Sequence, residues 1–273
     1  TSPRKLSDAL PNCGKPWFDA VEVLSCGYAK EQIRPVGYFS EEEEKPTVRI
    51  SDLDTWNTCP FKYWLQRKAS DEKKPEELYD PRKAGTLLHN VWEEAAKAVT
   101  SGGNNITWQG FVSENWDRIK KAYYPELDSD RRLALRERDL YEKIYAAAGL
   151  QNEIDETDDK KLRERIDTEY LFDDYEVNGV IFKGKTDRID FWSDGGAVLL
   201  DYKSGAGKNH VKELQIPAYC AILKEKAPET AINGMGWFGM KDCAISGCFS
   251  EEYKDIYKVK KGMNKTTVEL TEE

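Results

Sequence analysis

An acid and an amine stand two residues apart at Asp201 and Lys203, near the end of an apolar stretch. Residues 197–203 are apolar until these last positions, which is typical of a buried strand. Because side chains alternate along a strand, residues two apart point to the same face. A carboxylate there can hold a hard divalent cation, and an ammonium beside it can position a water molecule or a phosphate. The spacing therefore predicts a charged site at the end of a buried strand.

A second carboxylate, Asp187, lies on the preceding predicted strand, residues 180–192. A short turn over residues 193–196 joins the two strands, so we expect Asp187 to lie close to Asp201. Two carboxylates that share a cation beside a lysine suit hydrolysis of a phosphodiester, because the cation stabilises the transition state and makes bound water more acidic. The alternative is that these are ordinary charged residues at strand ends, and spacing alone does not decide between the two.

The spacing of apolar residues predicts the helices and strands that must position these charged residues. Apolar residues three and four apart between Ala84 and Ala98 predict an amphipathic helix. Ser51 is the expected N-cap of an earlier helix, and Pro60 the expected start of the next. Further helical patterns cover about residues 108–122, 130–150 and 211–224. Strand patterns cover residues 168–177, 180–192, 197–203 and 235–240, with Asn178-Gly179 as the hairpin turn between the first two.

Composition narrows the class of protein. The chain has 273 residues and a net charge of -9, whereas a nucleic-acid-binding surface is expected to be basic. Between Lys183 and Lys224, however, Lys and Arg outnumber Asp and Glu, which allows a local basic groove. No apolar stretch reaches the roughly 20 residues of a membrane helix and no signal-peptide core is present. We therefore expect a cytoplasmic protein without a membrane partner.

Residues 184–190 and 200–205 together resemble the core motif of the PD-(D/E)xK nuclease superfamily, and more narrowly the RecB-like nuclease domains of RecB, AddB and CRISPR-associated exonucleases. Four further features agree with this family in order: its opening helix pair (Ser51–Tyr63), its G-x-x-x-H helix (Gly85–His89), its first-strand acid (Glu169) and its Q-x-x-x-Y helix (Gln215–Tyr219). The resemblance covers about residues 48–240. It implies an α/β restriction-endonuclease-like core, a central mixed β-sheet flanked by helices, with a helical insertion at about 90–165.

The acidic run Glu41–Glu44, followed by Lys45-Pro46, indicates a domain boundary. Residues 1–46 are therefore expected to form a segment of unknown role, and residues 47–273 the nuclease domain. The resemblance also implies a set of metal ligands. His89, Asp187, Asp201 and the backbone carbonyl of Tyr202 would hold Mg²⁺ or Mn²⁺. A histidine ligand suits Mn²⁺ better than Mg²⁺, although a lone helical histidine is more often a packed or surface residue. Lys203 would orient the attacking water or the phosphate.

The sequence leaves two interpretations open for each of the other candidate residues: a role in the site, or a purely structural or surface role. Glu169 either adds a carboxylate to the site or pairs with a nearby lysine. Gln215 and Tyr219 share one helix face because they are four residues apart; they would bond to the lysine, to water or to a DNA phosphate, or Tyr219 would simply pack on the sheet. Three cations are candidate contacts to DNA phosphates, with solvated surface charge as the alternative for each: Lys185, Arg188 and Lys208.

The six cysteines are dispersed and do not indicate a disulfide framework. Several RecB-like nucleases hold a [4Fe–4S] cluster with one cysteine in the opening helices and three after the last core element. Cys59, Cys243 and Cys248 match part of that pattern, and Cys220 would be a fourth ligand. The spacing between Cys243 and Cys248 is not that of the usual three-cysteine group, and a cluster needs four converging ligands. We therefore do not expect a cluster.

These features together predict metal-dependent hydrolysis of DNA phosphodiesters, exonucleolytic on linear single- or double-stranded DNA. The first residue is not Met, so we expect either a trimmed chain or a piece of a longer one. The resemblance implies a helicase domain or subunit as a partner in recombination or repair. No G-x-x-x-x-G-K-[ST] motif is present, so any ATP-driven step would belong to that partner. The alternatives are a catalytically inactive nucleic-acid-binding or scaffolding module, a hydrolase of small phosphate esters, and a nuclease that prefers RNA.

Overall fold

The computed structural model describes residues 47–68, 78–101, 106–156, 163–177 and 180–259. The chain divides into two compact units, one from residues 1–74 with 176–182 and one from residues 75–175 with 183–273. The predicted N-terminal segment, 1–46, and the Asn178-Gly179 turn lie outside the described residues. Each unit is described by itself.

Between residues 47 and 68, the first unit contains a short strand, a 3-10 helix and two short α-helices. They are β1 (Thr47–Arg49), the 3-10 helix η2 (Ile50–Asp52), α2 (Leu53–Thr58) and α3 (Pro60–Lys68). Pro60 begins α3 as predicted, since its fixed φ and missing N–H suit a first turn. The prediction that Ser51 caps a helix is wrong: Ser51 lies inside η2, and α2 begins after Asp52 without a side-chain cap.

The second unit carries most of the helices and strands. Its helices are α4 (Pro81–Ser101), α5 (Trp108–Tyr123), α6 (Glu126–Ser129), η4 (Arg131–Leu133), α7 (Ala134–Glu156), η5 (Gly207–Asn209), α8 (Gln215–Lys226) and α9 (Glu251–Ile256). The strands that enter it are β2 (Arg163–Val177), β3 (Val180–Trp192), β4 (Gly196–Lys203), β5 (Ala231–Gly239) and β6 (Ala244–Phe249). Within the described ranges, no helix is both long enough and apolar enough to cross a bilayer.

The described strands form one mixed sheet in the order β1-β3-β4-β5-β6, with β2 also paired to β3. The β3–β4 and β5–β6 pairs are antiparallel, whereas β4 and β5 run parallel, joined by α8 as a crossover. Strand β4 is buried over almost its whole length, as its apolar sequence predicts. The mixed sheet flanked by helices confirms the predicted fold class.

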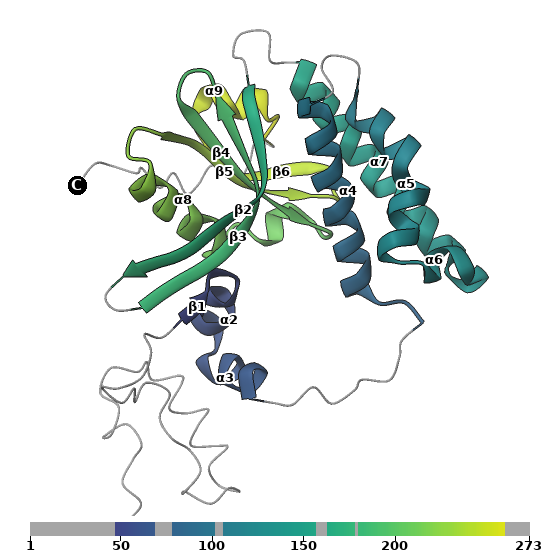
Figure 1. Cartoon of the computed structure of the whole chain (residues 1–273), viewed down its shortest axis with the longest axis horizontal. Coiled ribbons are helices and arrows are strands. Elements are labelled where there is room, and N and C mark those ends of the chain that lie inside the picture. Colours follow the sequence, from purple (N-terminus) through teal and green to yellow (C-terminus); the bar gives the residue numbers. More distant parts are fainter. Residues whose placement is uncertain (1–46, 69–77, 102–105, 157–162, 178–179, 260–273) are drawn as a thin grey trace, which may run out of the picture. The chain divides into compact units, whose positions relative to one another are not determined.

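Helices α4, α5 and α7 gather on one side of the sheet and α8 lies on the other (Figure 1). Aromatic side chains join α4 to the sheet: the Trp92 ring stacks on Tyr202 with centroids 5.4 Å apart and meets Phe238 at 5.2 Å. Trp108 of α5 packs against Trp92 at 5.0 Å. Such buried aromatic contacts contribute both apolar area and specific ring geometry. The helical insertion is therefore part of the core that supports β4.

Two local differences from the prediction have physical causes. Helix α8 begins at Gln215 rather than Val211, because the residues before it close separate turns: the N–H of His210 donates to the Gly207 carbonyl at 3.0 Å, and that of Glu213 to the His210 carbonyl at 2.8 Å. Strand β6 and helix α9 have no strong periodic pattern in the sequence. β6 forms by pairing with β5, from Gly234 opposite Phe249 to Gly239 opposite Ala244.

Candidate active site

His89 is positioned by the packing of α4. Its neighbours Leu88, Val91 and Trp92 are buried, and His89 lies at the edge of this apolar stripe with a side chain that is 36% exposed. Its ring meets Tyr202 edge-on, with centroids 6.0 Å apart. The imidazole therefore reaches from α4 towards Asp187 and Tyr202.

Asp187 lies on β3, and its side chain is held by a hydrogen bond from β4. The β3–β4 register runs from Phe191 opposite Ala197 to Arg188 opposite Leu200. One residue further, Oδ2 of Asp187 accepts a hydrogen bond from the backbone N–H of Tyr202 at 2.7 Å. Its other oxygen, Oδ1, lies 3.5 Å from Nδ1 of His89. One carboxylate thus satisfies a strand-end N–H and faces the histidine.

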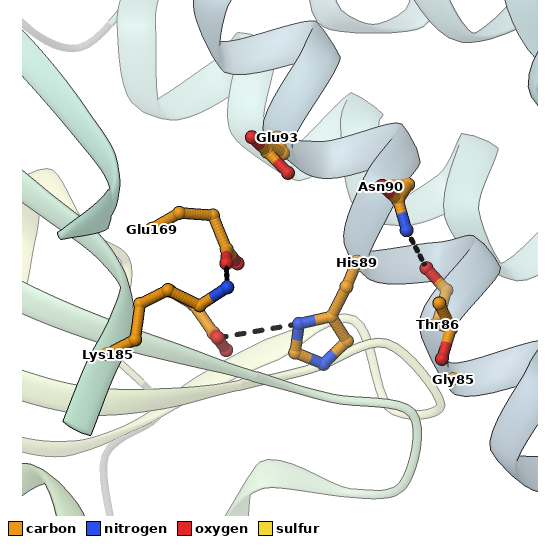
Figure 2. A pocket seen from close by; sticks show the side chains of 8 residues that line it. Gly85, Thr86, His89, Asn90, Glu93, Glu169 and Lys185 are labelled. Atoms are coloured by element: carbon orange, nitrogen blue, oxygen red, sulfur yellow. Dashed lines mark hydrogen bonds and ion pairs between the residues drawn. The ribbon is translucent and has the colours of Figure 1, made fainter. Parts of the chain in front are cut away.

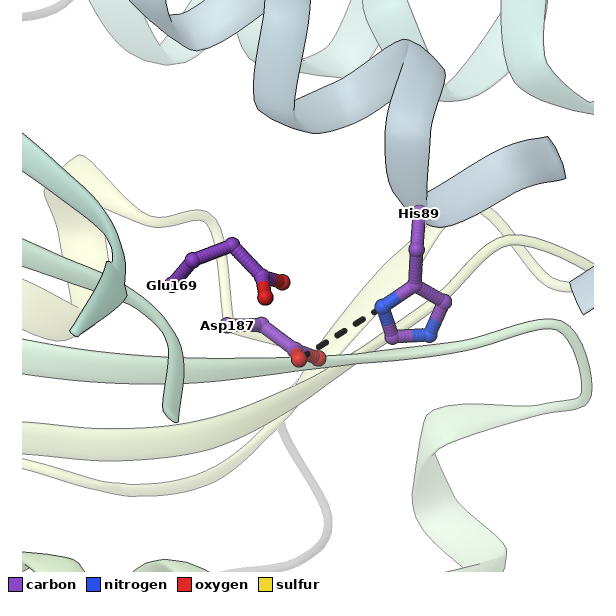
Figure 3. A group of neighbouring side chains, drawn as sticks. All are labelled: His89, Glu169 and Asp187. Carbon is purple, nitrogen blue, oxygen red and sulfur yellow. Dashed lines mark ion pairs between the residues drawn. The ribbon is translucent and has the colours of Figure 1, made fainter. Parts of the chain in front are cut away.

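Glu169 completes a group of potential metal ligands from three elements. It lies on β2 with an unusual positive φ of 54°, and its carboxylate forms an ion pair with Nζ of Lys185. One ligand atom each from His89, Glu169 and Asp187 lie within 4.8 Å of one another (Figure 3). Glu169 therefore makes both contacts that the sequence left open: it pairs with a lysine, and it lies beside Asp187.

A cavity of about 460 Å³ opens beside this group (Figure 2). It is lined by Gly85, Thr86, His89, Asn90, Glu93, Glu169, Lys185 and Asp187. One wall is α4 and the other is formed by β2 and β3. The three acids outnumber the one lysine, so the cavity favours cations over isolated anions.

Asp201 is nearly inaccessible, with 3% of its surface exposed. Burial and the neighbouring Asp187 carboxylate raise the pKa of Asp201 to about 6, although Lys203 opposes this shift. Nζ of Lys203 lies 2.8 Å from Oδ2 of Asp201. The two acids are thus close enough to repel each other, as their predicted strand positions require.

Lys203 contacts a second carboxylate that sequence reasoning missed. Its Nζ lies 3.3 Å from Oε2 of Glu213, while Oε1 of Glu213 lies 2.6 Å from Nδ1 of His210. Burial lowers the pKa of Lys203, but Asp201 and Glu213 outweigh burial and raise it above the usual value. The available signal was the short distance in sequence between Glu213 and the Q-x-x-x-Y helix that follows it.

Gln215 and Tyr219 lie at the start of α8. The Tyr219 hydroxyl donates to the Lys185 carbonyl at 2.9 Å and accepts from the Lys185 N–H at 3.1 Å. Gln215 hydrogen-bonds the same hydroxyl, and the Tyr219 ring stacks on Phe172 at 5.1 Å. Burial raises the pKa of Tyr219 to about 12, so it stays a hydroxyl. Its observed contacts fix β3 two residues before Asp187.

The three candidate DNA-binding cations lie in different surroundings. Lys185 has a side chain that is 52% exposed, at the cavity, and Lys208 is exposed on η5 after β4. Arg188 is fully buried and pairs with Asp190 through two nitrogens, at 2.5 and 2.6 Å. This placement corrects the expectation for Arg188, because an arginine enclosed in the core cannot reach a DNA phosphate.

Four cysteines lie in the described part of the chain. Cys59 follows α2 in the first unit. In the second unit, Cys220 is buried on α8, Cys243 precedes β6 and Cys248 lies on β6. Burial raises the pKa of Cys220 to about 12, which disfavours the thiolate that a metal needs. Among the described residues, the one group able to share an ion is that of His89 and its two acids.

The chain is similar in sequence to known nuclease proteins. Residues 48–269 match the model of the PD-(D/E)XK nuclease superfamily. An ATP-dependent helicase/deoxyribonuclease subunit of Carboxydothermus hydrogenoformans is 26% identical over 222 residues, which cover 68% of this chain and 19% of the relative. The same-named protein of Streptococcus agalactiae is 28% identical over 199 residues, covering 69% of this chain and 17% of the relative. The exonuclease/helicase subunit RexB of Lactococcus lactis is 22% identical over 217 residues, covering 74% and 19%.

The matched family region contains every residue of the candidate site, from His89 to Tyr219. The chain itself spans less than a fifth of the length of the curated relatives named above. The family match covers most of this chain, and the mixed sheet flanked by helices is consistent with it. The chain belongs to the PD-(D/E)XK nuclease superfamily.

Proposed function

We propose that this chain hydrolyses phosphodiester bonds of DNA with Mg²⁺ or Mn²⁺, at the site formed by His89, Asp187, Asp201 and Lys203. The observation that carries the proposal is the convergence of His89, Glu169 and Asp187 within 4.8 Å, beside the Asp201–Lys203 pair. Burial and, to a smaller extent, the Asp187 carboxylate raise the pKa of Asp201, and Asp187 also lines the adjacent cavity. An acid with a raised pKa beside a cavity is typical of functional sites.

The donor set fits a divalent cation. One imidazole nitrogen and two carboxylates are ligands that Mn²⁺ accepts, and the carboxylates suit Mg²⁺. A cation would also relieve the repulsion between Asp187 and Asp201, which Lys203 offsets only in part. We propose that Asp201 and the backbone carbonyl of Tyr202 complete the ligand set, as the family resemblance implies.

A divalent cation bound there would supply the positive charge that stabilises the transition state and makes an attacking water more acidic. The chain's own residues would do the positioning. The Lys203 ammonium would contact a phosphate oxygen or the attacking water, and its two carboxylate neighbours favour the charged form. Asp187 is held in place by the Tyr202 N–H, and Tyr219 fixes the strand that carries Asp187.

We propose that DNA approaches along the exposed cations, with Lys185 and Lys208 as phosphate contacts. Lys185 is paired with Glu169 in the structure, so engagement of Glu169 by a cation would release it. The relatives named above are helicase–nuclease subunits, and this chain covers less than a fifth of them. We therefore propose that it acts in the cytoplasm as the nuclease part of a helicase–nuclease, as an exonuclease on linear ends.

The test is cleavage of end-labelled linear DNA and closed-circular DNA in Mn²⁺, in Mg²⁺ and in EDTA. Wild type is compared with Lys203→Ala and Asp201→Ala. We expect linear DNA to be degraded with either metal, circles to persist, and both substitutions to lower the rate by at least about 100-fold, because each removes a group from the reacting centre.

The same assay separates the alternatives. A binding or scaffolding module would retain DNA with no cleavage in any metal. A hydrolase of small phosphate esters would cleave a nitrophenyl ester of thymidine phosphate and leave the polymer intact. Faster loss of RNA than of DNA of the same sequence would make RNA the substrate.

A further inference from the structure

Glu213 is the one carboxylate in the described part of the chain that touches both Lys203 and a histidine. Its two oxygens are used separately: Oε2 faces Nζ of Lys203 at 3.3 Å, and Oε1 lies 2.6 Å from Nδ1 of His210. The side chains of all three residues are between 20% and 28% exposed. They form a chain of contacts that runs from Asp201 through Lys203 and Glu213 to His210.

The segment that carries Glu213 and His210 is held firmly at both ends. The N–H of Met240 donates to the Lys203 carbonyl at 2.9 Å, which anchors the start of the segment to the end of β5. Gly207 packs so closely on β5 that a Cβ there would lie 2.5 Å from the Trp237 carbonyl oxygen. The Glu213 N–H donates to the His210 carbonyl at 2.8 Å, so backbone and side chain both close the same turn.

Glu213 matters because the other carboxylate partner of Lys203, Asp201, is also a proposed ligand of the cation. Asp201 holds Lys203 at 2.8 Å. A divalent cation that engaged Asp201 would draw on the same carboxylate and repel the ammonium. Glu213 lies outside the proposed ligand set, so its attraction for Lys203 is unchanged by the cation. Outer-shell carboxylates that orient a working side chain are common around metal sites.

We propose that Glu213 is a positioning residue: it holds the Lys203 ammonium in the site while a divalent cation occupies Asp201, and His210 in turn fixes Glu213. This inference deepens the proposed nuclease function and rests on it. It assigns Glu213 no contact with DNA or with the cation.

The test compares wild type with Glu213→Gln, which keeps the shape of the side chain but removes its charge. The matched control is Glu229→Gln, an exposed glutamate beyond the opposite end of α8. Three quantities are measured: the single-turnover rate of cleavage, the dissociation constant for DNA in Ca²⁺, and the ammonium signals of ¹⁵N-lysine-labelled protein with and without Ca²⁺. A Lys203→Met variant assigns the Lys203 signal.

We expect Glu213→Gln to lower the single-turnover rate by about 10- to 100-fold, with the dissociation constant for DNA in Ca²⁺ changed by less than about twofold. Its Lys203 signal should disappear when Ca²⁺ is added, whereas wild type and Glu229→Gln keep it. His210→Ala, which leaves Glu213 in place, should show a smaller loss of rate of the same kind. If Glu213→Gln melts at a lower temperature than wild type, His210→Ala provides a second test of whether Glu213 positions Lys203.

A wild-type rate in Glu213→Gln would overturn the inference, as would a Lys203 signal that survives Ca²⁺ in this variant. A loss of DNA affinity as large as the loss of rate would also overturn it, because Glu213 would then act in binding. If wild type cleaves no DNA, the nuclease proposal fails; the ammonium signals still report whether Glu213 holds Lys203.

Discussion

At the scale of single residues, Asp187 and Asp201 occupy unlike surroundings within one site. Asp187 accepts a backbone hydrogen bond and faces His89, whereas Asp201 is buried against Lys203. Burial lowers the pKa of His89, but the two acids outweigh burial and raise it above the usual value. Asp201 and His89 therefore hold their protons more tightly than the same side chains do in water.

This arrangement predicts that cation binding displaces protons. The pKa of Asp201 is raised to about 6, so the folded protein binds this proton more tightly than the unfolded chain. The stabilising contribution of that proton is present at low pH and is lost as pH rises through about 6, and the raised pKa of His89 acts in the same direction. We expect the affinity for Mn²⁺ to rise from about pH 5 to about pH 7, with protons released on binding.

Isothermal titration calorimetry with Mn²⁺ in two buffers of different ionisation enthalpy measures both quantities. Asp201→Asn should release fewer protons than wild type across the same range. An affinity that is constant over this range, with the same heat in both buffers, would show that neither group binds the ion.

The sequence could predict the residues with a motif but not those whose partners are distant. Arg188 and Asp190 form a buried ion pair, and the sequence contains one signal for it. The two residues are two apart on a strand, so they share the face opposite that of Asp187. Their burial depends on Gln151 of α7 and Tyr257 after α9, which lie 37 and 67 residues away. Glu213 likewise gains its role from Lys203, on the far side of a turn.

At the scale of elements, a buried ionic network ties the helical insertion to the strand that carries Asp187. Asp190 of β3 accepts two bonds from Arg188 and one from the Tyr257 hydroxyl at 2.5 Å. Arg188 also donates to Gln151 at 3.0 Å. Burial raises the pKa of Asp190, but Arg188 and Arg163 outweigh burial and lower it below the usual value. The acid therefore stays ionised inside the core.

Removal of one partner from this network should be costly. Arg188→Met leaves the Asp190 carboxylate buried without its main counter-charge, and we expect the free energy of unfolding to fall by about 3–5 kcal/mol. Urea unfolding followed by circular dichroism measures this change. The control is Arg138→Met on α7, which removes an exposed pair with Glu142 and should leave the unfolding midpoint almost unchanged. Equal midpoints for Arg188→Met and wild type would contradict a structural role for the network.

The bounds of a helix or strand can be predicted where its hydrophobic residues recur with a clear period. They cannot be predicted where pairing with a neighbouring strand determines the structure. The periodic patterns of α4, α5 and β3 give bounds close to those observed. β6 is a strand because β5 offers it a partner, and its own residues, with Gly247 at its centre, do not indicate one. The pattern places the start of α8 too early because the turns before it are closed by local hydrogen bonds that leave no periodic signal.

At the scale of the whole molecule, the chain matches only a small part of the length of its curated relatives. The family match covers residues 48–269, while the curated relatives are more than five times as long as the matched part. The proposed helicase partner would thus supply movement along DNA, and the site at the end of β4 would supply cleavage. Cleavage of linear DNA by this chain alone is therefore the critical property.

The most direct test measures bound Mn²⁺ by electron paramagnetic resonance and loss of linear DNA in the same samples, for wild type and Asp187→Asn. An exposed acid on α9, altered by Asp255→Asn, is the control. We expect wild type and Asp255→Asn to bind Mn²⁺ and degrade the DNA, and Asp187→Asn to lose both by at least about 100-fold, because Asp187 contacts both His89 and the end of β4. Wild type that binds Mn²⁺ and DNA without cleaving, or Asp187→Asn that cleaves at the wild-type rate, would contradict a metal-dependent nuclease centred on Asp187.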